Sequence, residues 1–279
     1  MGLSNYLSNL RHFYYGAGTA GLIDVVGSAD WTEQGTVGLN SSDGPPPAAG
    51  GTSRGPCDST TTGFSRSPTG DYLDLRSTTD ITMFAWARLD SRSTSQELFG
   101  WWTGTANEQA LLYRYDHSFE TPILLAQGNT NNISTGPGAI NLWQDTGANA
   151  WHFCGWSYNT STDKITHCFD DNILTAADDF GNFSHSVLTP ARIGVTVSGV
   201  SGAGLKGDVA YVNVFDYAFD ESDWSYFYNG GNGRPYPDQY VRPVTGLFPV
   251  VAKSFLIRKD AAVKNEHNRV FLDAAKRRT

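Results

Sequence analysis

Six glutamates give this sequence its clearest capacity for acid–base chemistry, because glycosidic-bond hydrolysis needs two carboxylates that flank the scissile bond. Only Glu221 has a second carboxylate two residues away, Asp223. That pair falls at the start of a predicted helix, whereas carboxylates facing one cleft from a strand must alternate along it. We therefore predict a protein that is not an enzyme. The glutamates are Glu33, Glu97, Glu108, Glu120, Glu221 and Glu266.

Three cysteines, Cys57, Cys154 and Cys168, cannot form a complete disulfide framework within one chain. Residues 151–169 are predicted to form a β-hairpin. If its loop is 159–163, Tyr158 pairs with Lys164 and Cys154 faces Cys168 directly. Such a pair forms either a disulfide or a reduced buried pair, and both alternatives stay open. Cys57 is left over in either case.

Aromatic side chains provide a second kind of chemistry, the stacking of sugar rings. The candidates for a glycan platform are Trp101, Trp102, Tyr113, Tyr115 and Trp143. The alternative places them in the core, where most aromatic side chains of strands lie. No histidine and cysteine spacing indicates a zinc site, because the six histidines are scattered.

Short apolar runs separated by Gly, Asn, Ser and Thr must position these residues, and they predict strands. Ile81–Leu89 is apolar at most positions, which is typical of a strand buried between two layers. A helix is predicted near 220–229, with Asp220 as its N-cap and Gly230-Gly231 as its end. The fold class is therefore all-β, an antiparallel β-sandwich of the jelly-roll type. The predicted strands are 71–76, 81–89, 97–102, 110–115, 123–127, 151–158, 164–169, 191–197 and 205–215.

Composition divides the chain into three parts. Residues 1–20 are predicted to form an N-terminal arm or short helix, and 21–236 the sandwich. Within the sandwich, 41–70 is predicted to be a loop or disordered linker, because 11 of its 30 residues are Gly or Pro and 11 more are Ser or Thr. Residues 237–279 are predicted to form an extended arm and a basic helix. That helix has a narrow apolar face that must pack on something; its assembly residues are Val263, Val270, Phe271, Arg258 and Arg277.

The order of four segments resembles the laminin-G-like, concanavalin-A-like jelly-roll superfamily of lectins and glucanases. The resemblance covers roughly residues 20–236 and is most specific in the last segment, with its Gly-Asp-bearing strand and Tyr-Asn-Gly helix end. The segments are TGDYLDL with DITMFAWARLDS (Thr69–Leu75 and Asp80–Ser91), WHFCGWSYNTSTDKITHCFDDN (Trp151–Asn172), ARIG (Ala191–Gly194) and LKGDVAYVNVFDYAFDESDWSYFYNGGNGRPY (Leu205–Tyr236).

The resemblance implies two features of a site. Members often carry a structural Ca²⁺ at the edge of the sandwich, and Asp71 and Asp208 fall in the segments that would supply its ligands. The alternative is that these aspartates make turns and cap strand ends. Enzymes that resemble the superfamily's glucanases typically carry their catalytic carboxylates in a Glu-x-Asp-x-Glu pattern along one strand. This sequence has no such pattern. The superfamily also includes lectins, adhesion modules and viral structural proteins, so the resemblance predicts the fold more closely than the function.

Charge is unevenly distributed along the chain. The formal net charge is −8, which argues against nucleic acid as a partner. Residues 253–279 hold eight basic and three acidic side chains, which leaves 12 basic and 25 acidic ones elsewhere. No apolar run approaches the roughly 20 residues of a membrane-spanning helix, so membrane insertion is not expected. The sequence start does not have the basic and apolar pattern of a secretory signal.

These features favour a structural protein that displays a lectin-like sandwich. The predicted function is a virion component, such as a phage capsid decoration or tail protein, anchored by its terminal arms. Its expected partners are neighbouring subunits in a homo-oligomer or capsid, together with host glycans, and its expected location is the virion surface. The alternative is a carbohydrate-binding or adhesion module of a bacterial surface protein, located outside the cell.

Overall fold

The computed structural model describes residues 6–15, 23–24, 26–27, 30–34, 37, 39–40, 44–46, 53–58, 63–66, 79–91, 93–101, 111–118, 121–127, 132–135, 150–176, 191–194 and 203–234. All of them lie within Asn5–Val241. The predicted C-terminal arm and helix, 237–279, lie outside the described residues, and so do the assembly residues Val263, Val270, Phe271, Arg258 and Arg277.

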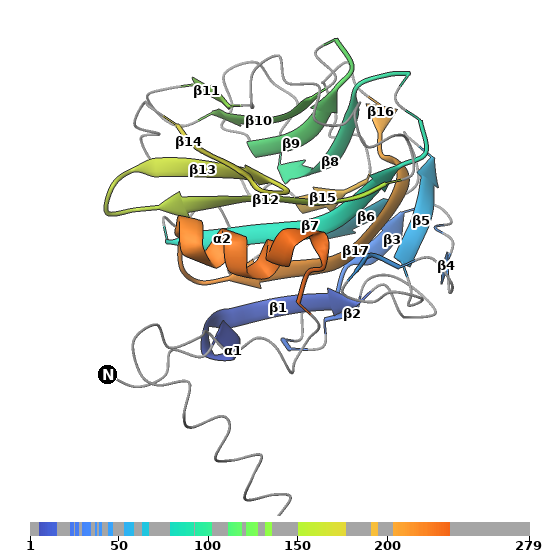
Figure 1. The fold of residues 1–279 in the computed structure, drawn as a ribbon. Coiled ribbons are helices and arrows are strands. Elements are labelled where there is room, and N and C mark those ends of the chain that lie inside the picture. Colours follow the sequence, from blue (N-terminus) through green and yellow to red (C-terminus); the bar gives the residue numbers. More distant parts are fainter. Residues whose placement is uncertain are drawn as a thin grey trace, which may run out of the picture. The chain divides into compact units, whose positions relative to one another are not determined.

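The chain folds into two β-sheets that face each other, as predicted (Figure 1). Pairing is antiparallel except between β16 and β8. The first sheet has the order β14 (Asn172–Thr175), β13 (Lys164–Phe169), β12 (Trp151–Asn159), β7 (Ile81–Leu89), β17 (Lys206–Phe215), β1 (Leu10–Tyr15) and β2 (Ile23–Asp24), with β5 (Ser53–Asp58) on β17 and β4 (Leu39–Asn40) on β5.

The second sheet closes the sandwich from the other side. Its order is β11 (Asn132–Thr135), β10 (Thr121–Gln127), β9 (Leu111–Asp116), β8 (Gln96–Trp101), β15 (Ala191–Ile193), β6 (Gly63–Arg66) and β3 (Thr32–Gln34), with β16 (Ala203–Gly204) on β8. The described helices are short: α1 (Tyr6–Asn9), α2 (Glu221–Tyr228) and the 3₁₀ turn η2 (Asn229–Gly231). None of the helices in the described part of the chain has the length and apolar character needed to span a bilayer.

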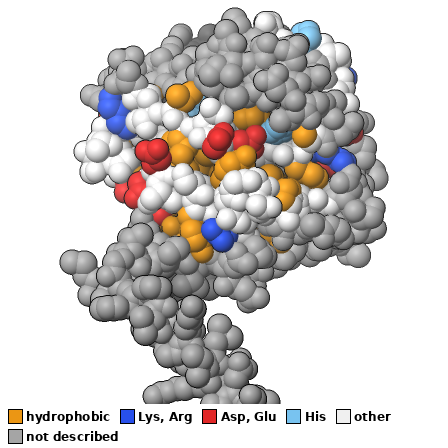
Figure 2. Space-filling view, in the orientation of Figure 1, with side chains coloured by type: hydrophobic (Ala, Val, Ile, Leu, Met, Phe, Trp, Pro, Cys, Tyr) orange, Lys and Arg blue, Asp and Glu red, His pale blue; other side chains and the backbone are white. Residues whose placement is uncertain are grey.

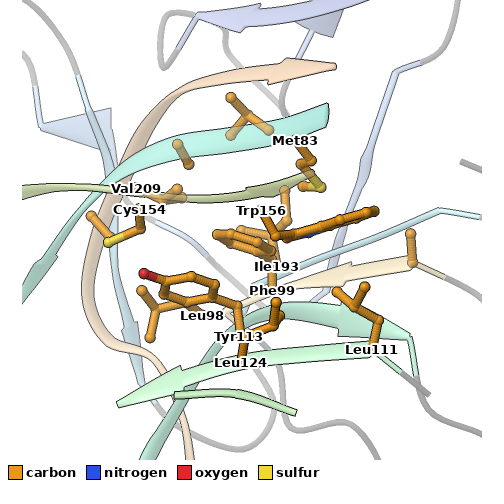
Figure 3. Packing of buried hydrophobic residues seen from close by; sticks show 14 of the residues in the cluster. Met83, Leu98, Phe99, Leu111, Tyr113, Leu124, Cys154, Trp156, Ile193 and Val209 are labelled. Atoms are coloured by element: carbon orange, nitrogen blue, oxygen red, sulfur yellow. The ribbon is translucent and has the colours of Figure 1, made fainter. Parts of the chain in front are cut away.

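The first core fills the space between the sheets, and Figure 3 shows side chains from both sheets converging there. Met83, Cys154 and Trp156 come from the first sheet, whereas Phe99 and Tyr113 come from the second, and all are at most 1% exposed. The rings of Trp101 and Trp156 meet edge to face across the gap, with centroids 5.9 Å apart. This is the core expected of a sandwich whose strands alternate inward and outward side chains.

A second core lies on the outer face of the first sheet, beneath α2 (Figure 1). Phe84 and Trp86 of β7, which share one face of that strand, join Phe153 of β12 there. Trp224 and Phe227 of α2 cover them. This layer explains why β7 is buried on both faces, as its apolar sequence predicted. The complete set is Tyr6, Leu10, Phe84, Trp86, Phe153, Cys168, Ala210, Tyr211, Phe215, Phe219, Trp224 and Phe227.

The predicted helix is confirmed together with its N-cap. Asp220 accepts a hydrogen bond from the backbone of Asp223 at 2.9 Å, and the Asp223 carboxylate accepts one from the backbone of Asp220 at 3.1 Å. This reciprocal capping box satisfies two backbone donors that the first helical turn would leave unpaired. The helix ends at Tyr228, and its C-cap Asn229 has a left-handed conformation (φ 51°), one residue before Gly230.

The N-terminal segment belongs to the sandwich rather than to a separate arm. Strand β1 pairs with β17, from Leu10 opposite Phe215 to Tyr14 opposite Val212. Its side chains enter both cores, because Leu10 lies in the second and Tyr14 in the first. The predicted division at residue 20 therefore misplaces the start of the sandwich. The six apolar residues of this segment do not alternate regularly, so the sequence does not show that it pairs as a strand.

The Gly/Pro-rich segment 41–70 contains strands where we predicted only a loop. Strands β5 and β6 lie in it, and β5 pairs with β17. Between Cys57 and Arg54 the register of that pairing shifts by one residue, so Pro56 falls at an irregularity of the ladder. Proline is tolerated there because no regular ladder bond needs its missing N–H. The Gly, Pro, Ser and Thr content of this segment led to the wrong prediction, because strands pair through backbone groups and require no particular side chains.

Candidate ligand-binding surface

The aromatic residues chosen from sequence as a glycan platform lie in the core. Trp101 is 1% exposed, and Tyr113 and Tyr115 are fully buried. A buried ring offers no face to a sugar, so the alternative assignment to the core holds for these three. Trp102 and Trp143 lie outside the described residues.

Of the two expected Ca²⁺ ligands the structure describes Asp208 alone, whose side chain binds an arginine, and the Ca²⁺ site stays a prediction. The carboxylate of Asp208 is 2% exposed and binds the guanidinium of Arg88, with Nε 3.1 Å from Oδ2 and a second, shorter contact from Nη2. A cation bound there would have to displace another cation. Asp71 lies outside the described residues, and within them no three His, Cys, Asp or Glu side chains cluster as a metal site would require.

The two hairpin cysteines lie on opposite faces of the first sheet. The observed register pairs Asn159 with Lys164, so Cys154 faces Phe169 and Gly155 faces Cys168. The predicted register is therefore wrong by one residue, and one residue exchanges the two faces of a strand. Cys154 lies in the first core and Cys168 in the second, both as free thiols. Burial raises the pKa of each thiol well above its usual value.

A buried polar pair inside the first core links the two sheets. Tyr113 of β9 donates a hydrogen bond to the carbonyl of Cys168 at 2.8 Å, and His167 Nε2 lies 2.9 Å from the same phenol oxygen. Because the phenol proton is used, Nε2 must carry the imidazole proton and donate it. Burial lowers the pKa of His167 to about 3, so the ring is neutral. With no solvent access, this pair serves the fold rather than a ligand.

Half-buried aromatic side chains at the margin of the second core form the surface that best suits a ligand. We call Trp151, Asp170, Asp171, Ile173 and Tyr228 the rim. Trp151, Ile173 and Tyr228 pack against the second core but remain partly accessible. Only Val26 is an exposed large hydrophobic side chain among the described residues, so rings of this kind are the main apolar surface available there.

Strand β12 positions one end of the rim. Trp151 lies two residues before Phe153, on the same face of the strand, and is directly opposite Arg88 of β7. The Arg88 guanidinium lies 5.4 Å from the centroid of the Trp151 ring, within reach of a cation–π contact. Its partner Asp208 is the next residue across, on β17. An ordered row therefore runs from an indole to a guanidinium to a carboxylate.

The turn between β13 and β14 places two carboxylates beside these rings. Asp170 has a left-handed backbone (φ 53°), and its carboxylate holds that conformation by accepting hydrogen bonds from Phe153 N at 2.9 Å and from His152 Nδ1 at 2.7 Å. The Asp170 amide returns a bond to the Phe153 carbonyl at 2.8 Å. These contacts fix the turn to the start of β12, and its second carboxylate, Asp171, is exposed.

Helix α2 supplies the remaining ring. Tyr228 is its last residue and lies 6.2 Å from the Phe153 ring, measured between centroids. Burial, and then the charges of Asp170 and Asp171, raise the pKa of Tyr228 to about 12, so its hydroxyl stays protonated. Figure 2 shows acidic and apolar side chains side by side over the region where Figure 1 places α2.

The positions of apolar residues along β12 and α2 indicate this surface in the sequence, although they form no recognised motif. Trp151 and Phe153 share a face once the strand is known, and Tyr228 continues the stripe of Trp224 and Phe227 only at its margin. Residues at the end of an apolar stripe are those that reach solvent. The aspartates of the turn were visible as a pair, but their proximity to the rings required the hairpin register.

Comparison with known proteins shows similarity of fold. No protein-family model and no curated protein sequence matches this chain. Among solved structures, the binding domain of Paraclostridial Mosquitocidal Protein 1 superposes with a TM-score of 0.59 at 12% identity, over 80% of this chain and 52% of that one. The binding domain of botulinum neurotoxin DC, solved with rat synaptotagmin II, gives 0.56 at 9% identity, over 80% and 52%.

A third similar structure is a smaller domain. Domain 4 of the extracellular arabinanase AbnA of Geobacillus stearothermophilus, solved in complex with arabinotriose, has a TM-score of 0.55 at 13% identity. The match covers 78% of this chain and 97% of that domain. This chain spans about half the length of the toxin binding domains it matches. At these identities the likeness establishes an all-β sandwich fold shared with binding domains.

Proposed function

We propose that this chain is a non-catalytic carbohydrate-binding module that acts outside the cell. The observation that carries the proposal is the rim, where Trp151 and Tyr228 pack on the second core yet stay partly accessible, and where the charges of Asp170 and Asp171 act on Tyr228. Pockets and surfaces that bind polar ligands combine apolar faces with a few fixed polar groups, and the rim has both. This is the function that we first stated as the alternative.

The structural neighbours support a sugar ligand in particular. The arabinanase domain matches along nearly its whole length and was solved with a trisaccharide. The toxin domains are binding domains too, one of them solved with a protein receptor. We favour a saccharide over a protein partner because the described surface offers scattered rings and carboxylates rather than a broad apolar patch.

Several carboxylates hold the fold together through ion pairs and hydrogen bonds, which supports a role without catalysis. Asp208 binds Arg88, Asp116 binds Arg114 Nη2 at 2.6 Å, and Asp223 caps α2. A general acid needs a carboxyl group that can exchange its proton with substrate. The carboxylates that these contacts hold are committed to guanidinium groups and backbone amides instead.

Binding of oligosaccharides by the whole chain tests the proposal. Titration calorimetry against arabinotriose, maltotriose, cellotriose and lactose should show saturable binding to at least one, and prolonged incubation should leave that sugar intact. Absence of binding to all four at millimolar concentrations, or their cleavage, would contradict the proposal. The virion and homo-oligomer hypotheses remain predictions, because the tail that motivated them lies outside the described residues.

A further inference from the structure

We infer that the rim selects neutral saccharides and rejects both anionic and cationic ligands. The inference rests on the proposed carbohydrate-binding function and specifies its ligand class and its site. Three groups carry it: the ring of Trp151, the guanidinium of Arg88, and the paired carboxylates of Asp170 and Asp171.

Trp151 supplies an apolar surface of carbon atoms. Its only polar side-chain atom, Nε1, is buried and has no hydrogen-bond partner among the described residues. The part of the ring that reaches solvent therefore consists of C–H groups, which suit the C–H face of a pyranose or furanose ring. Packing on the second core and contact with Arg88 hold the indole in place. A ring that is already fixed loses little conformational entropy when a ligand binds.

The carboxylates exclude anionic sugars. Asp171 is exposed and Asp170 retains 19% side-chain exposure, and the two lie on consecutive residues of one turn. The whole chain carries a net charge of −8, so no general positive field offsets them. A sialic acid or uronic acid brought against the rim would face two like charges within a Debye length. Carboxylates accept hydrogen bonds from sugar hydroxyls without this penalty.

Arg88 excludes cations from the same ring. An aromatic side chain flanked by carboxylates would otherwise attract a quaternary ammonium group. Here the Arg88 guanidinium, held by Asp208, already lies 5.4 Å from the Trp151 centroid and takes the place that a cation would occupy beside that ring. A cationic ligand on the Trp151 ring would have to compete with the Arg88 guanidinium for the same position. With both signs of charge disfavoured, hydroxyl groups and C–H faces remain, which is the chemistry of an uncharged sugar.

A matched pair of sugars tests the selectivity. Lactose and 3′-sialyllactose differ by one charged residue, and calorimetry at low salt should show at least tenfold tighter binding of lactose, or of a neutral trisaccharide over trigalacturonate. The difference should shrink in 0.5 M NaCl, where surface charges are screened. Asp171→Asn should also reduce it, whereas Glu221→Gln, an equal loss of charge at the opposite end of α2, should not.

Substitution of the ring tests the placement of the site. Trp151→Ala should weaken binding of the neutral sugar at least tenfold, and Trp151→Phe by less. Tyr217→Ala is the matched control, because Tyr217 is also partly buried against the second core. It adjoins Thr82, six residues from Arg88 along β7, or about 20 Å at the rise of a strand. This control should bind as the unchanged protein does.

The possible failures are distinguishable. If the unchanged protein binds a sugar but Trp151→Ala binds it equally well, the rim is the wrong site although the proposed function stands. If sialyllactose binds more tightly than lactose, or choline competes for the site, the selectivity inference is overturned. If none of the sugars binds, the proposed function itself fails.

Discussion

The two cores of this domain use opposite faces of the same five strands, β1, β7, β12, β13 and β17. The first core lies between two sheets and mixes aliphatic with aromatic side chains. The second lies between one sheet and two short helices, and nine of its twelve residues are aromatic. Helices of four and eight residues are too short to be stable alone. Large rings therefore supply, from few positions, the buried area that a second sheet supplies elsewhere.

The difference also explains where a ligand surface arises. A sandwich core is closed by a sheet on each side, so its rings are sealed from solvent, as Trp101 and Tyr113 show. A core covered by one short helix has a margin, and rings at that margin, such as Trp151 and Tyr228, stay partly accessible. Four predictions test this difference between the two cores.

The largest effect is expected from Trp224→Ala. This fully buried ring contacts Phe84, Phe153 and Phe219, with centroids 5.0 to 6.3 Å apart. Its loss should lower the free energy of unfolding by about 3–5 kcal/mol, as much as Trp156→Ala in the first core. Urea denaturation followed by circular dichroism and fluorescence should show one transition. An unchanged midpoint with loss of helix signal alone would make α2 an independent appendage.

Gly155→Ala should have the next largest effect, because a side chain there would meet both β7 and α2. A Cβ at this position would lie 2.6 Å from Phe84 Cβ and 2.8 Å from both the Met83 carbonyl and Trp224 Cζ3. We expect a loss of about 2–3 kcal/mol in the free energy of unfolding. Ser157→Ala, on the same face two residues along, is the control and should cost much less. Equal stability of the two variants would mean that the helix has room to move.

A loss of stability at acidic pH is predicted for the first core, where His167 lies. The folded pKa of His167 is about 3, below its unfolded value of 6.5, so the unfolded chain binds a proton that the folded one does not. The contribution is zero above pH 6.5 and grows as the pH falls. Between pH 6.5 and 5 the protein should lose about 2 kcal/mol more than the His167→Leu variant does. Parallel pH profiles of the two proteins would refute this.

The smallest effect should come from Tyr6→Phe. The Tyr6 hydroxyl donates to the Asp223 carboxylate at 2.8 Å, which ties the N-terminal segment to the start of α2. Loss of this buried hydrogen bond to a carboxylate should cost about 1.5 kcal/mol. A double-mutant cycle with Asp223→Asn measures the coupling, and a value near zero would show that ring packing alone, such as the stacking on Tyr226 at 5.1 Å, holds Tyr6.

The fold was predictable from sequence where side chains alone determine an element. Strand β7 and helix α2 were predicted with their observed bounds or nearly so, because apolar runs and capping residues are local signals. The hairpin register was missed because Asn159 looks like a loop residue. Its side chain does accept bonds from Ser161 and Thr162 in the turn, yet its backbone still pairs with Lys164. A residue whose side chain stabilises a turn while its backbone pairs in a strand cannot be recognised from residue type alone.

The site was less predictable than the fold. The aromatic platform chosen from sequence contained rings of the first core, since residue type does not reveal which layer a ring enters. Trp156 faces the second sheet in the first core, whereas Trp151, the first residue of β12, lies on the other face of the strand and packs against the second core. Asp208 is buried in β17 and binds Arg88, whereas Asp171 is exposed in the turn between β13 and β14. These differences depend on tertiary neighbours, which no single segment encodes.

The pairing of β1 with β17 has a consequence for biosynthesis. The ion pair between Arg11 and Asp216 joins residues 205 positions apart, and the ladder beside it pairs residues 198 to 205 positions apart. A ribosome therefore releases the first strand long before its partner exists. The early strand must wait unpaired, with apolar side chains such as Leu10 and Tyr14 exposed to other nascent chains. We expect slow, late closure of this sheet and a need for chaperones that decreases once β17 has emerged.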